Sequence, residues 1–336
     1  MRTPFNILGM GWALPKNEID NDFLHKEVGL KKTPEWCLSR LGIQKRYSVL
    51  SREYIVKTKN KDPLAAIVHA RANGETPVTL AVRAAQKAMA HCDVKPSQIG
   101  MVVCNSDLPF DLVPGTANYI AKALGIGPGP HMDMNTACSS FARHMMYLSD
   151  LRDSAWPEFV LTVQTGCYTT RTDYSHENFD GYIWGDGAAA QICSLKHKGR
   201  LKVEPILFAT DPQGADDVKV DATRHFWQDG AKIREFSIRR TVEMFEQIAA
   251  AKKLFAEDVY TVTHQANFVM QESIIGHLNL PKEHHISNVQ IQGNIAAAGM
   301  PSAIAQKLDH LKKGDQIVYA VLGAGLAWGG GYMEVQ

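Results

Sequence analysis

The sequence has almost no excess of charge of either sign. Its 336 residues include 36 Lys and Arg against 35 Asp and Glu, which gives a formal net charge of +1 at pH 7. A broad face that binds nucleic acid or a membrane surface needs a marked excess of positive charge. No apolar run reaches the roughly 18 residues that a membrane-spanning helix needs. The sequence therefore indicates neither a nucleic-acid partner nor a membrane partner.

Export signals and metal-binding spacings are also missing. The stretch MRTPFNILGMGWALP has a proline at position 4 and too short an apolar run for a secretion signal. The chain contains six cysteines, and no two of them form a C-x-x-C pair. Zinc sites and small disulfide frameworks are therefore unfavoured. Scattered thiols without a signal peptide are typical of the reducing cytoplasm, where we expect this protein.

The sequence does contain alternating strand-like and helix-like segments, a pattern typical of α/β proteins. Strands are predicted at 5–13, 101–106, 131–135, 159–165, 201–208, 259–263, 316–322 and 327–335. Helices are predicted at 33–41, 77–91, 115–124, 236–254 and 302–312, and after positions 138 and 267. The segment 55–75 is less regular, and we interpret it as a loop-rich insertion. The length and the repeated βα style predict two similar units, 1–196 and 197–336.

One cysteine stands at a chemically informative position. In MDMNTACSSFARHMM (132–146), Cys138 begins a helix whose apolar face includes Phe141, Ala142 and Met145. The unpaired N–H groups and the positive dipole end at the start of a helix favour the thiolate form of a cysteine. We therefore interpret Cys138 as a candidate nucleophile. The alternative is a small buried hydrophobic residue.

Two further polar residues occupy positions where chemistry is expected. His264 directly follows the β-branched segment 259–263, and α/β proteins gather functional groups at strand ends. Asn294 lies in QIQGNIAAAGMP (290–301), where small neighbours would let its amide approach a ligand. The alternatives are a structural histidine and an ordinary Gly-Asn turn. The segment VLGAGLAWGGG (321–331) lacks the order of a phosphate-binding loop and predicts a backbone turn that faces a cavity.

Taken together, NTACSSF, GDGAAA, HQAN, GNIAAAG and GAGLAWG resemble the thiolase-fold condensing enzymes, specifically the β-ketoacyl-acyl-carrier-protein synthase III family. The likeness runs from about residue 5 to the last predicted strand. It implies an α/β thiolase fold in which two similar βα halves form a five-layered αβαβα arrangement. The half 1–196 would carry the nucleophilic cysteine, and the half 197–336 would carry the histidine and the asparagine.

The resemblance also implies a role for each site residue. Cys138 would accept an acyl group from a thioester as a covalent acyl-enzyme. His264 and Asn294 would donate hydrogen bonds to the thioester oxygen of a malonyl substrate, whose decarboxylation produces a carbanion. The backbone N–H groups of Cys138 and Ala324 would form the oxyanion hole. Such a reaction requires no metal or redox cofactor.

Substrates and partners follow from the same resemblance. The segment TPEWCLSRLGIQKR (33–46) resembles the family's acyl-CoA entrance, where Trp36 and Arg40 would stack on and hold the CoA nucleotide. The expected enzyme is an acyltransferase that uses acyl-CoA and a malonyl thioester, with an acyl carrier protein as partner and a homodimer as assembly. Two alternatives stay open: acyl transfer from Cys138 to an oxygen or nitrogen nucleophile, and a non-catalytic subunit of a heteromeric synthase.

Several positions depart from the family pattern. Ile295 replaces the threonine of the usual GNT, which predicts a more apolar wall beside Asn294, and Ala324 replaces a usual glycine. Val269 stands where housekeeping relatives carry an arginine that docks the carrier protein. Another basic face is available from Arg239, Arg240, Lys252 and Lys253. The segment SDLPFDLVPG (106–115) is also unusual, and we expect it near the acyl tunnel or the dimer interface. These departures favour a specialised relative, such as one that serves secondary metabolism.

Overall fold

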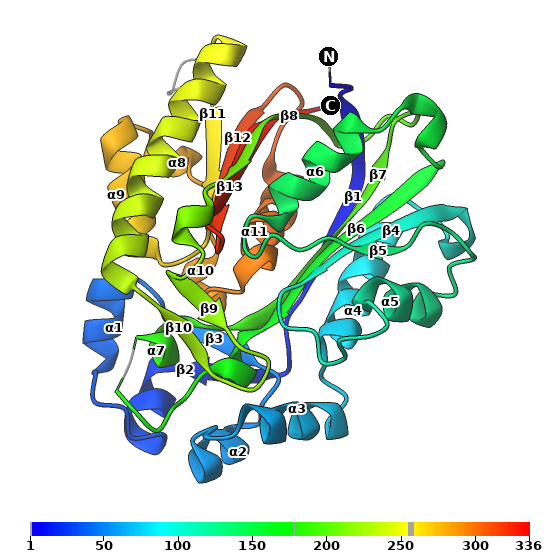
Figure 1. The fold of residues 1–336 in the computed structure, drawn as a ribbon. Coiled ribbons are helices and arrows are strands. Elements are labelled where there is room, and N and C mark those ends of the chain that lie inside the picture. Colours follow the sequence, from blue (N-terminus) through cyan, green and yellow to red (C-terminus); the bar gives the residue numbers. More distant parts are fainter. Residues whose placement is uncertain (1, 178, 255–258) are drawn as a thin grey trace.

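The computed structural model describes residues 2–177, 179–254 and 259–336 (Figure 1). Within these ranges, nine strands form one mixed sheet in the order β11-β12-β13-β8-β1-β7-β6-β4-β5. The strands of this sheet are β1 (Phe5–Ala13), β4 (Ile99–Ser106), β5 (Met132–Asp133), β6 (Phe159–Cys167), β7 (Asp186–Ser194), β8 (Leu201–Thr210), β11 (Val259–Thr263), β12 (Gln316–Gly323) and β13 (Ala327–Val335). The eight predicted strands named above are present, and the ninth, β7, confirms the further prediction that WGDGAAAQI (184–192) is a tight turn followed by a buried strand of small residues.

The pairing of the strands repeats in the two halves of the chain. β4 runs parallel to β6, β6 antiparallel to β7, and β7 antiparallel to β1. The same succession of directions recurs for β11, β12, β13 and β8. The two sets of strands join where residues 5–7 of β1 pair with residues 201–203 of β8. The boundary predicted at 196/197 falls between β7 and β8, and its use as a domain limit stays a prediction.

The helices form layers on both sides of the strands. The central layer consists of α6 (Ser140–Asp150) and α11 (Gly299–Lys307), each of which contacts strands from both halves. On the outside, α4 (Pro77–Ala90) and α5 (Thr116–Leu124) cover the first half, and α8 (Gly230–Lys252) and α9 (Phe268–Leu278) cover the second (Figure 1). The predicted five-layered αβαβα arrangement is confirmed.

The fit of α4 on the sheet shows how the sequence determines this layering. The helix begins where Thr76 accepts a hydrogen bond from the Thr79 N–H and Pro77 occupies the first turn. Its Ala84 and Ala88 carbonyls lie so close to β1 that a Cβ on Gly11 or Gly9 would approach them to 2.2 and 2.3 Å. Only glycine on the strand and alanine on the helix permit this close contact.

The interpretation of 55–75 as a loop-rich insertion was wrong. The chain there forms α2 (Arg52–Thr58) and α3 (Pro63–Ala72). The Asp62 carboxylate accepts hydrogen bonds from the Leu64 and Ala65 N–H groups, and Pro63 fits the first helical position. The Asp62–Pro63 pair is a helix start signal, and it predicts α3 better than the mixed composition of the segment does.

The remaining elements are short and surround one end of the sheet. They are α1 (Pro34–Leu41), α7 (Asp180–Ile183), α10 (Val289–Gln292), the antiparallel pair of β2 (Asn17–Asp20) and β3 (Lys45–Ser48), and the hairpin of β9 (Val218–Val220) with β10 (Phe226–Gln228). The predicted helix at 302–312 is α11, which starts earlier and ends at Lys307. Among the described residues, no helix is long and apolar enough to cross a membrane.

Candidate active site

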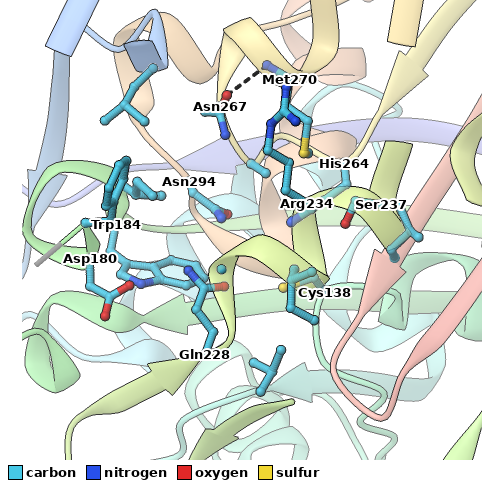
Figure 2. A pocket seen from close by; sticks show the side chains of 18 of the residues that line it. Cys138, Asp180, Trp184, Gln228, Arg234, Ser237, His264, Asn267, Met270 and Asn294 are labelled. Carbon is cyan, nitrogen blue, oxygen red and sulfur yellow. Dashed lines mark hydrogen bonds between the residues drawn. The ribbon is translucent and has the colours of Figure 1, made fainter. Parts of the chain in front are cut away.

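All six residues predicted for the site line one cavity of about 1110 Å³. Cys138 comes from the first half of the chain, and His264 and Asn294 come from the second (Figure 2). The other three lining residues are Trp36, Arg40 and Ala324. Residues separated by more than 100 positions are therefore brought to one chamber, as the resemblance required.

Cys138 lies in a tight turn that precedes α6. Ala137 has a positive φ of 49°, a left-handed conformation that is uncommon for a residue with a side chain. The Ser139 hydroxyl donates to the Thr136 carbonyl at 2.6 Å, and the Ser140 hydroxyl donates to the Ala137 carbonyl at 2.7 Å. These hydrogen bonds hold the turn that presents the Cys138 sulfur to the cavity.

The expectation that the start of a helix favours the thiolate form of Cys138 was wrong for the protein without substrate. Burial raises the pKa of the Cys138 thiol well above its usual range, and the nearby Asp107 carboxylate raises it further. The backbone N–H of Cys138 itself acts in the opposite direction, but its effect is smaller. The helix-terminus argument considered only local groups, whereas the surrounding protein favours the neutral thiol.

The segment after β12 lies directly against the nucleophile turn. A Cβ on Gly323 would come within 2.9 Å of the Cys138 backbone nitrogen and 2.7 Å of the Thr136 carbonyl oxygen. A glycine at this position therefore lets Ala324, the next residue, approach Cys138 closely. Cys138 and Ala324 both line the cavity, and the role of their N–H groups as an oxyanion hole stays a prediction.

His264 is placed by its backbone, while its ring makes no hydrogen bond to any residue that the structure describes. The His264 N–H donates to the Ala320 carbonyl on β12, and the His264 carbonyl accepts from the Gln271 side chain. Burial lowers the pKa of the imidazole to about 4. The ring is therefore neutral near pH 7 and has one N–H to donate to a ligand.

Asn294 is held with one side of its amide engaged. Its Oδ1 accepts a hydrogen bond from the Ala296 N–H at 2.9 Å, which leaves the NH2 group as the available donor. Its backbone is fixed by hydrogen bonds with the Ile183 carbonyl and the Gly185 N–H. The neighbouring Ile295 is fully buried against Ala189 and Ala298 and does not line the cavity. Ile295 is therefore part of the hydrophobic core, and the prediction that it forms an apolar wall of the cavity beside Asn294 was wrong.

Trp36 and Arg40 lie on α1 at the mouth of the cavity. The Trp36 ring contacts Phe179 with ring centroids 5.4 Å apart and Tyr182 at 5.9 Å, and the Lys32 ammonium lies 5.1 Å from the Trp36 ring centroid. The exposed Arg40 guanidinium makes no ion pair within the described part of the chain. The same holds for Arg234 on α8, which the sequence analysis missed.

The sequence analysis also missed an aromatic wall beside the nucleophile. The rings of Tyr168 and Trp184 stack with centroids 4.1 Å apart, and Phe226 meets Trp184 edge-on at 4.8 Å. Cys138 packs against this cluster together with Leu108, which belongs to the unusual segment 106–115. The three rings come from separate segments without a shared motif, so no sequence signal identified them.

The basic face suggested for carrier docking is largely neutralised. Arg239 and Arg240 both pair with Glu243, and Lys252 pairs with Glu204. Val269, at the position of the missing arginine, lines the cavity.

Comparison with known proteins places this geometry in a class. The family described as 3-Oxoacyl-[acyl-carrier-protein (ACP)] synthase III C terminal matches residues 249–335. The β-ketoacyl-[acyl-carrier-protein] synthase III of Rubrobacter xylanophilus is 29% identical over 326 residues, which cover 96% of each chain. The 3-oxoacyl-[acyl-carrier-protein] synthase III of Aquifex aeolicus VF5 superposes with a TM-score of 0.85 at 22% identity, covering 98% of this chain and 99% of the other.

A third similar structure is the priming β-ketosynthase of the R1128 polyketide biosynthetic pathway. It has a TM-score of 0.84 and 21% identity, and it covers 99% of this chain and 97% of its own. The fold is therefore that of the thiolase-like condensing enzymes. Within that class, the chain is similar along nearly its whole length to β-ketoacyl-[acyl-carrier-protein] synthase III proteins, and its residues 249–335 match the C-terminal model of that family.

Proposed function

We propose that the protein is an acyltransferase that forms an acyl-Cys138 thioester and then condenses it with a malonyl thioester by decarboxylation. The observation that carries this proposal is the meeting of the Cys138 thiol, the unpaired His264 ring and the free Asn294 NH2 group in one cavity. One nucleophile and two neutral donors are the groups that this pair of half-reactions needs.

In the first half-reaction, the Cys138 sulfur attacks the carbonyl carbon of an acyl thioester and loses its proton. The C–S bond to CoA breaks, and the CoA sulfur leaves with a proton as free thiol. Because the pKa of Cys138 is raised, we expect its proton to leave as the new C–S bond forms. The backbone N–H groups of Cys138 and Ala324 would stabilise the oxyanion of the tetrahedral intermediate.

In the second half-reaction, His264 and Asn294 would donate hydrogen bonds to the thioester carbonyl of the malonyl substrate. The bond between its carboxylate and its C2 carbon breaks, CO2 leaves, and the electron pair forms an enolate. The enolate carbon attacks the acyl-Cys138 carbonyl, a C–C bond forms, and the cysteine sulfur leaves and regains a proton. A neutral imidazole can fill this role, since its single N–H donates a hydrogen bond to the thioester oxygen while the ring carries no charge.

Substrate delivery is proposed from the mouth of the cavity. Trp36 offers an aromatic face, and the exposed guanidinium groups of Arg40 and Arg234 are free to bind the phosphates of CoA. The same groups would bind the phosphopantetheine phosphate of an acyl carrier protein. Carrier docking through α9 lacks the usual arginine because Val269 replaces it.

We also propose a homodimer in the cytoplasm. β5 is the edge strand of the nine-stranded sheet, and the loop between β4 and α5, whose end contacts Asp133 of β5, exposes Leu112 and Val113 by 79% and 85%. An open strand edge beside exposed apolar side chains supports pairing with a second copy. Each of the six cysteines is unpaired, which fits a reducing compartment.

The deciding experiment follows both half-reactions on one sample. The protein is incubated with a panel of acyl-CoA donors and examined by intact mass, and then supplied with malonyl thioester carrying a 13C-labelled carboxylate. The proposal expects an acyl adduct, followed by release of labelled CO2 and a 3-oxoacyl product. An adduct that transfers to an alcohol or amine without loss of CO2 would favour the transfer alternative. The absence of any adduct would favour a non-catalytic subunit.

A further inference from the structure

The carboxylate of Asp107 acts electrostatically on Cys138, and the proposed mechanism does not use it. It follows β4 in the unusual segment 106–115, and it does not line the cavity. Asp107 makes no ion pair with any residue in the described ranges. A carboxylate in such surroundings destabilises a neighbouring thiolate, and Asp107 does raise the pKa of Cys138. Its presence beside a nucleophile therefore needs a physical reason.

The first reason is the aromatic wall. The Tyr168 hydroxyl donates a hydrogen bond to Asp107 Oδ2 at 3.3 Å. Tyr168 lines the cavity, stacks on Trp184, and belongs to the cluster against which Cys138 packs. Asp107 therefore holds the ring that borders the position of an acyl group on the Cys138 sulfur.

The second reason is the nucleophile turn itself. The Asn105 NH2 group donates to Asp107 Oδ1 at 2.8 Å and to Asn135 Oδ1 at 3.0 Å. Asn135 Oδ1 also accepts from the Ala137 N–H at 2.7 Å. Ala137 is the left-handed residue directly before Cys138. A chain of three hydrogen bonds thus joins the Asp107 carboxylate to the strained position of the turn.

The third reason involves the turn that carries Asn294. The Ala297 N–H interacts with the Asp107 carboxylate and lowers its pKa, against the larger effect of burial that raises it to about 6. Ala297 directly follows Ala296, whose N–H holds the Asn294 amide. One carboxylate therefore contacts or connects to three separate segments of the cavity wall.

We propose that Asp107 is a positioning residue that fixes the Tyr168 ring and the turn before Cys138 in the geometry needed for acylation. The inference rests on the proposed function, because it concerns the acylation step. Carboxylate is suited to the task, since its two oxygens accept from several donors that approach from different directions. The Asp107 carboxylate also raises the pKa of Cys138, which disfavours the reactive thiolate. In this proposal, the gain from correct placement of the sulfur is larger than that loss.

The first test is Asp107→Asn, which keeps the size but removes the charge and one accepting oxygen. Removing the negative charge should lower the pKa of Cys138, so that alkylation by iodoacetamide reaches half its maximal rate at a lower pH. Acylation at saturating acyl-CoA should nevertheless slow by about tenfold to a hundredfold, since the sulfur and the wall are misplaced. The KM for acyl-CoA should change less than about threefold, because the mouth is untouched. A purely structural role would not move the two reactions in opposite directions.

The groups that face Asp107 make this pH readout interpretable. They are Tyr168 after β6, Cys138 before α6 and Cys104 on β4. Burial raises the pKa of Tyr168 and Cys104 well above their usual ranges, so neither ionises near neutral pH. A shift in the alkylation profile therefore reports on Cys138 and Asp107.

Two further variants keep the test decisive if Asp107→Asn does not fold. Asp107→Glu keeps the charge but displaces the carboxylate, so acylation should slow while the alkylation profile stays unchanged. Tyr168→Phe removes only the hydroxyl, and we expect a smaller, several-fold loss of acylation. The matched control is Asp133→Asn, whose carboxylate accepts from the Thr116 and Ala117 N–H groups at 2.7 Å on the side of α5. It should leave acylation and alkylation as in the wild type.

The outcomes separate this inference from the proposed function. If the wild type forms no acyl adduct, the proposed function fails and the inference fails with it. If the wild type is acylated and Asp107→Asn or Asp107→Glu matches its rate, only the positioning role is wrong. If acylation and alkylation of Asp107→Asn slow together, Asp107 acts on the proton of Cys138 rather than on its position, which also overturns the inference.

Discussion

The two walls of the cavity treat their polar side chains in opposite ways. On the wall from the first half, Asn105, Asn135 and Asp107 are joined in one hydrogen-bond chain behind Cys138. On the wall from the second half, the His264 ring makes no hydrogen bond within the described residues, and Asn294 uses only its carbonyl oxygen. Behind Cys138, the Asn105 NH2 group is fully engaged, whereas the His264 ring and the Asn294 NH2 group keep donors for a ligand.

This difference has an energetic meaning. A buried polar group without a partner costs about 1–3 kcal/mol, and a ligand that pairs with it recovers that free energy. The His264 ring is such a group, and a substrate carbonyl could accept from it and from the Asn294 NH2 group. Cys138 needs placement instead, because its sulfur must form and break a covalent bond at a defined angle. The wall that carries Cys138 would form the covalent bond, and the wall that carries His264 and Asn294 would stabilise the negative charge.

The strongest way to test this assignment is to remove the nucleophile. Cys138→Ser should show no acyl thioester adduct with any acyl-CoA and no condensation, because the sulfur forms the covalent intermediate. Intact mass after incubation with acyl-CoA measures the loss. Cys92→Ser is the matched control, since Cys92 is the other partly buried cysteine. An adduct of equal yield on Cys138→Ser that peptide mapping places outside position 138 would assign acylation to another residue.

The next largest effects are expected from the donors of the opposite wall. His264→Ala and Asn294→Ala should each lower the condensation rate by about a hundredfold to a thousandfold, as loss of an oxyanion donor does. Their acylation of Cys138 should stay close to the wild-type rate, since that step uses the backbone donors. Separate single-turnover assays of acylation and decarboxylation distinguish the two. If either variant fails to be acylated, the division between the walls does not hold.

Smaller effects are expected at the mouth of the cavity. Trp36→Ala and Arg40→Ala should raise the KM for acyl-CoA by about tenfold while kcat changes little, because these contacts are equal in ground and transition states. Steady-state kinetics with acyl-CoA and with a short acyl-pantetheine thioester make the check. The pantetheine substrate lacks the nucleotide, so the variants and the wild type should use it equally well.

Local patterns predicted the strands, and the family resemblance joined Cys138, His264 and Asn294, which the fold brings to one cavity, while their roles stay predictions. Gly-Asn turns, strand ends and the Thr76–Pro77 helix start are visible in a few adjacent residues. The segment 55–75 was predicted to be rich in loops because its mixed composition was given more weight than the helix start signal at Asp62–Pro63.

What escaped prediction depends on contacts between distant segments. The thiol of Cys138 was expected to favour ionisation, but burial and Asp107, which lies 31 positions earlier, raise its pKa. Tyr168, Trp184 and Phe226 form one wall from three segments, and no periodicity connects them. Motifs identified which groups could react, whereas only the fold determined their protonation and surroundings.

The lowered pKa of His264 also affects the stability of the folded protein. The pKa of His264 is about 4 in the folded protein, below the ordinary value of 6.5 that an unfolded chain would show. As the pH falls through 6.5 towards 4, the unfolded state therefore binds a proton that the folded state does not. The folded state is fully favoured above this window and loses stability within it.

His264→Ala removes this linkage. Between pH 7 and pH 5, the wild type should lose up to about 2 kcal/mol more unfolding free energy than His264→Ala does. Urea unfolding of both proteins at the two pH values measures the difference. Asn294→Ala is the control, since it alters the same wall without removing a titratable group, and its stability relative to the wild type should not depend on pH. Equal acid sensitivity of His264→Ala and the wild type would show that the pKa of His264 is the same in the folded and unfolded states, and the lowered pKa that keeps the buried ring neutral in mild acid would then be wrong.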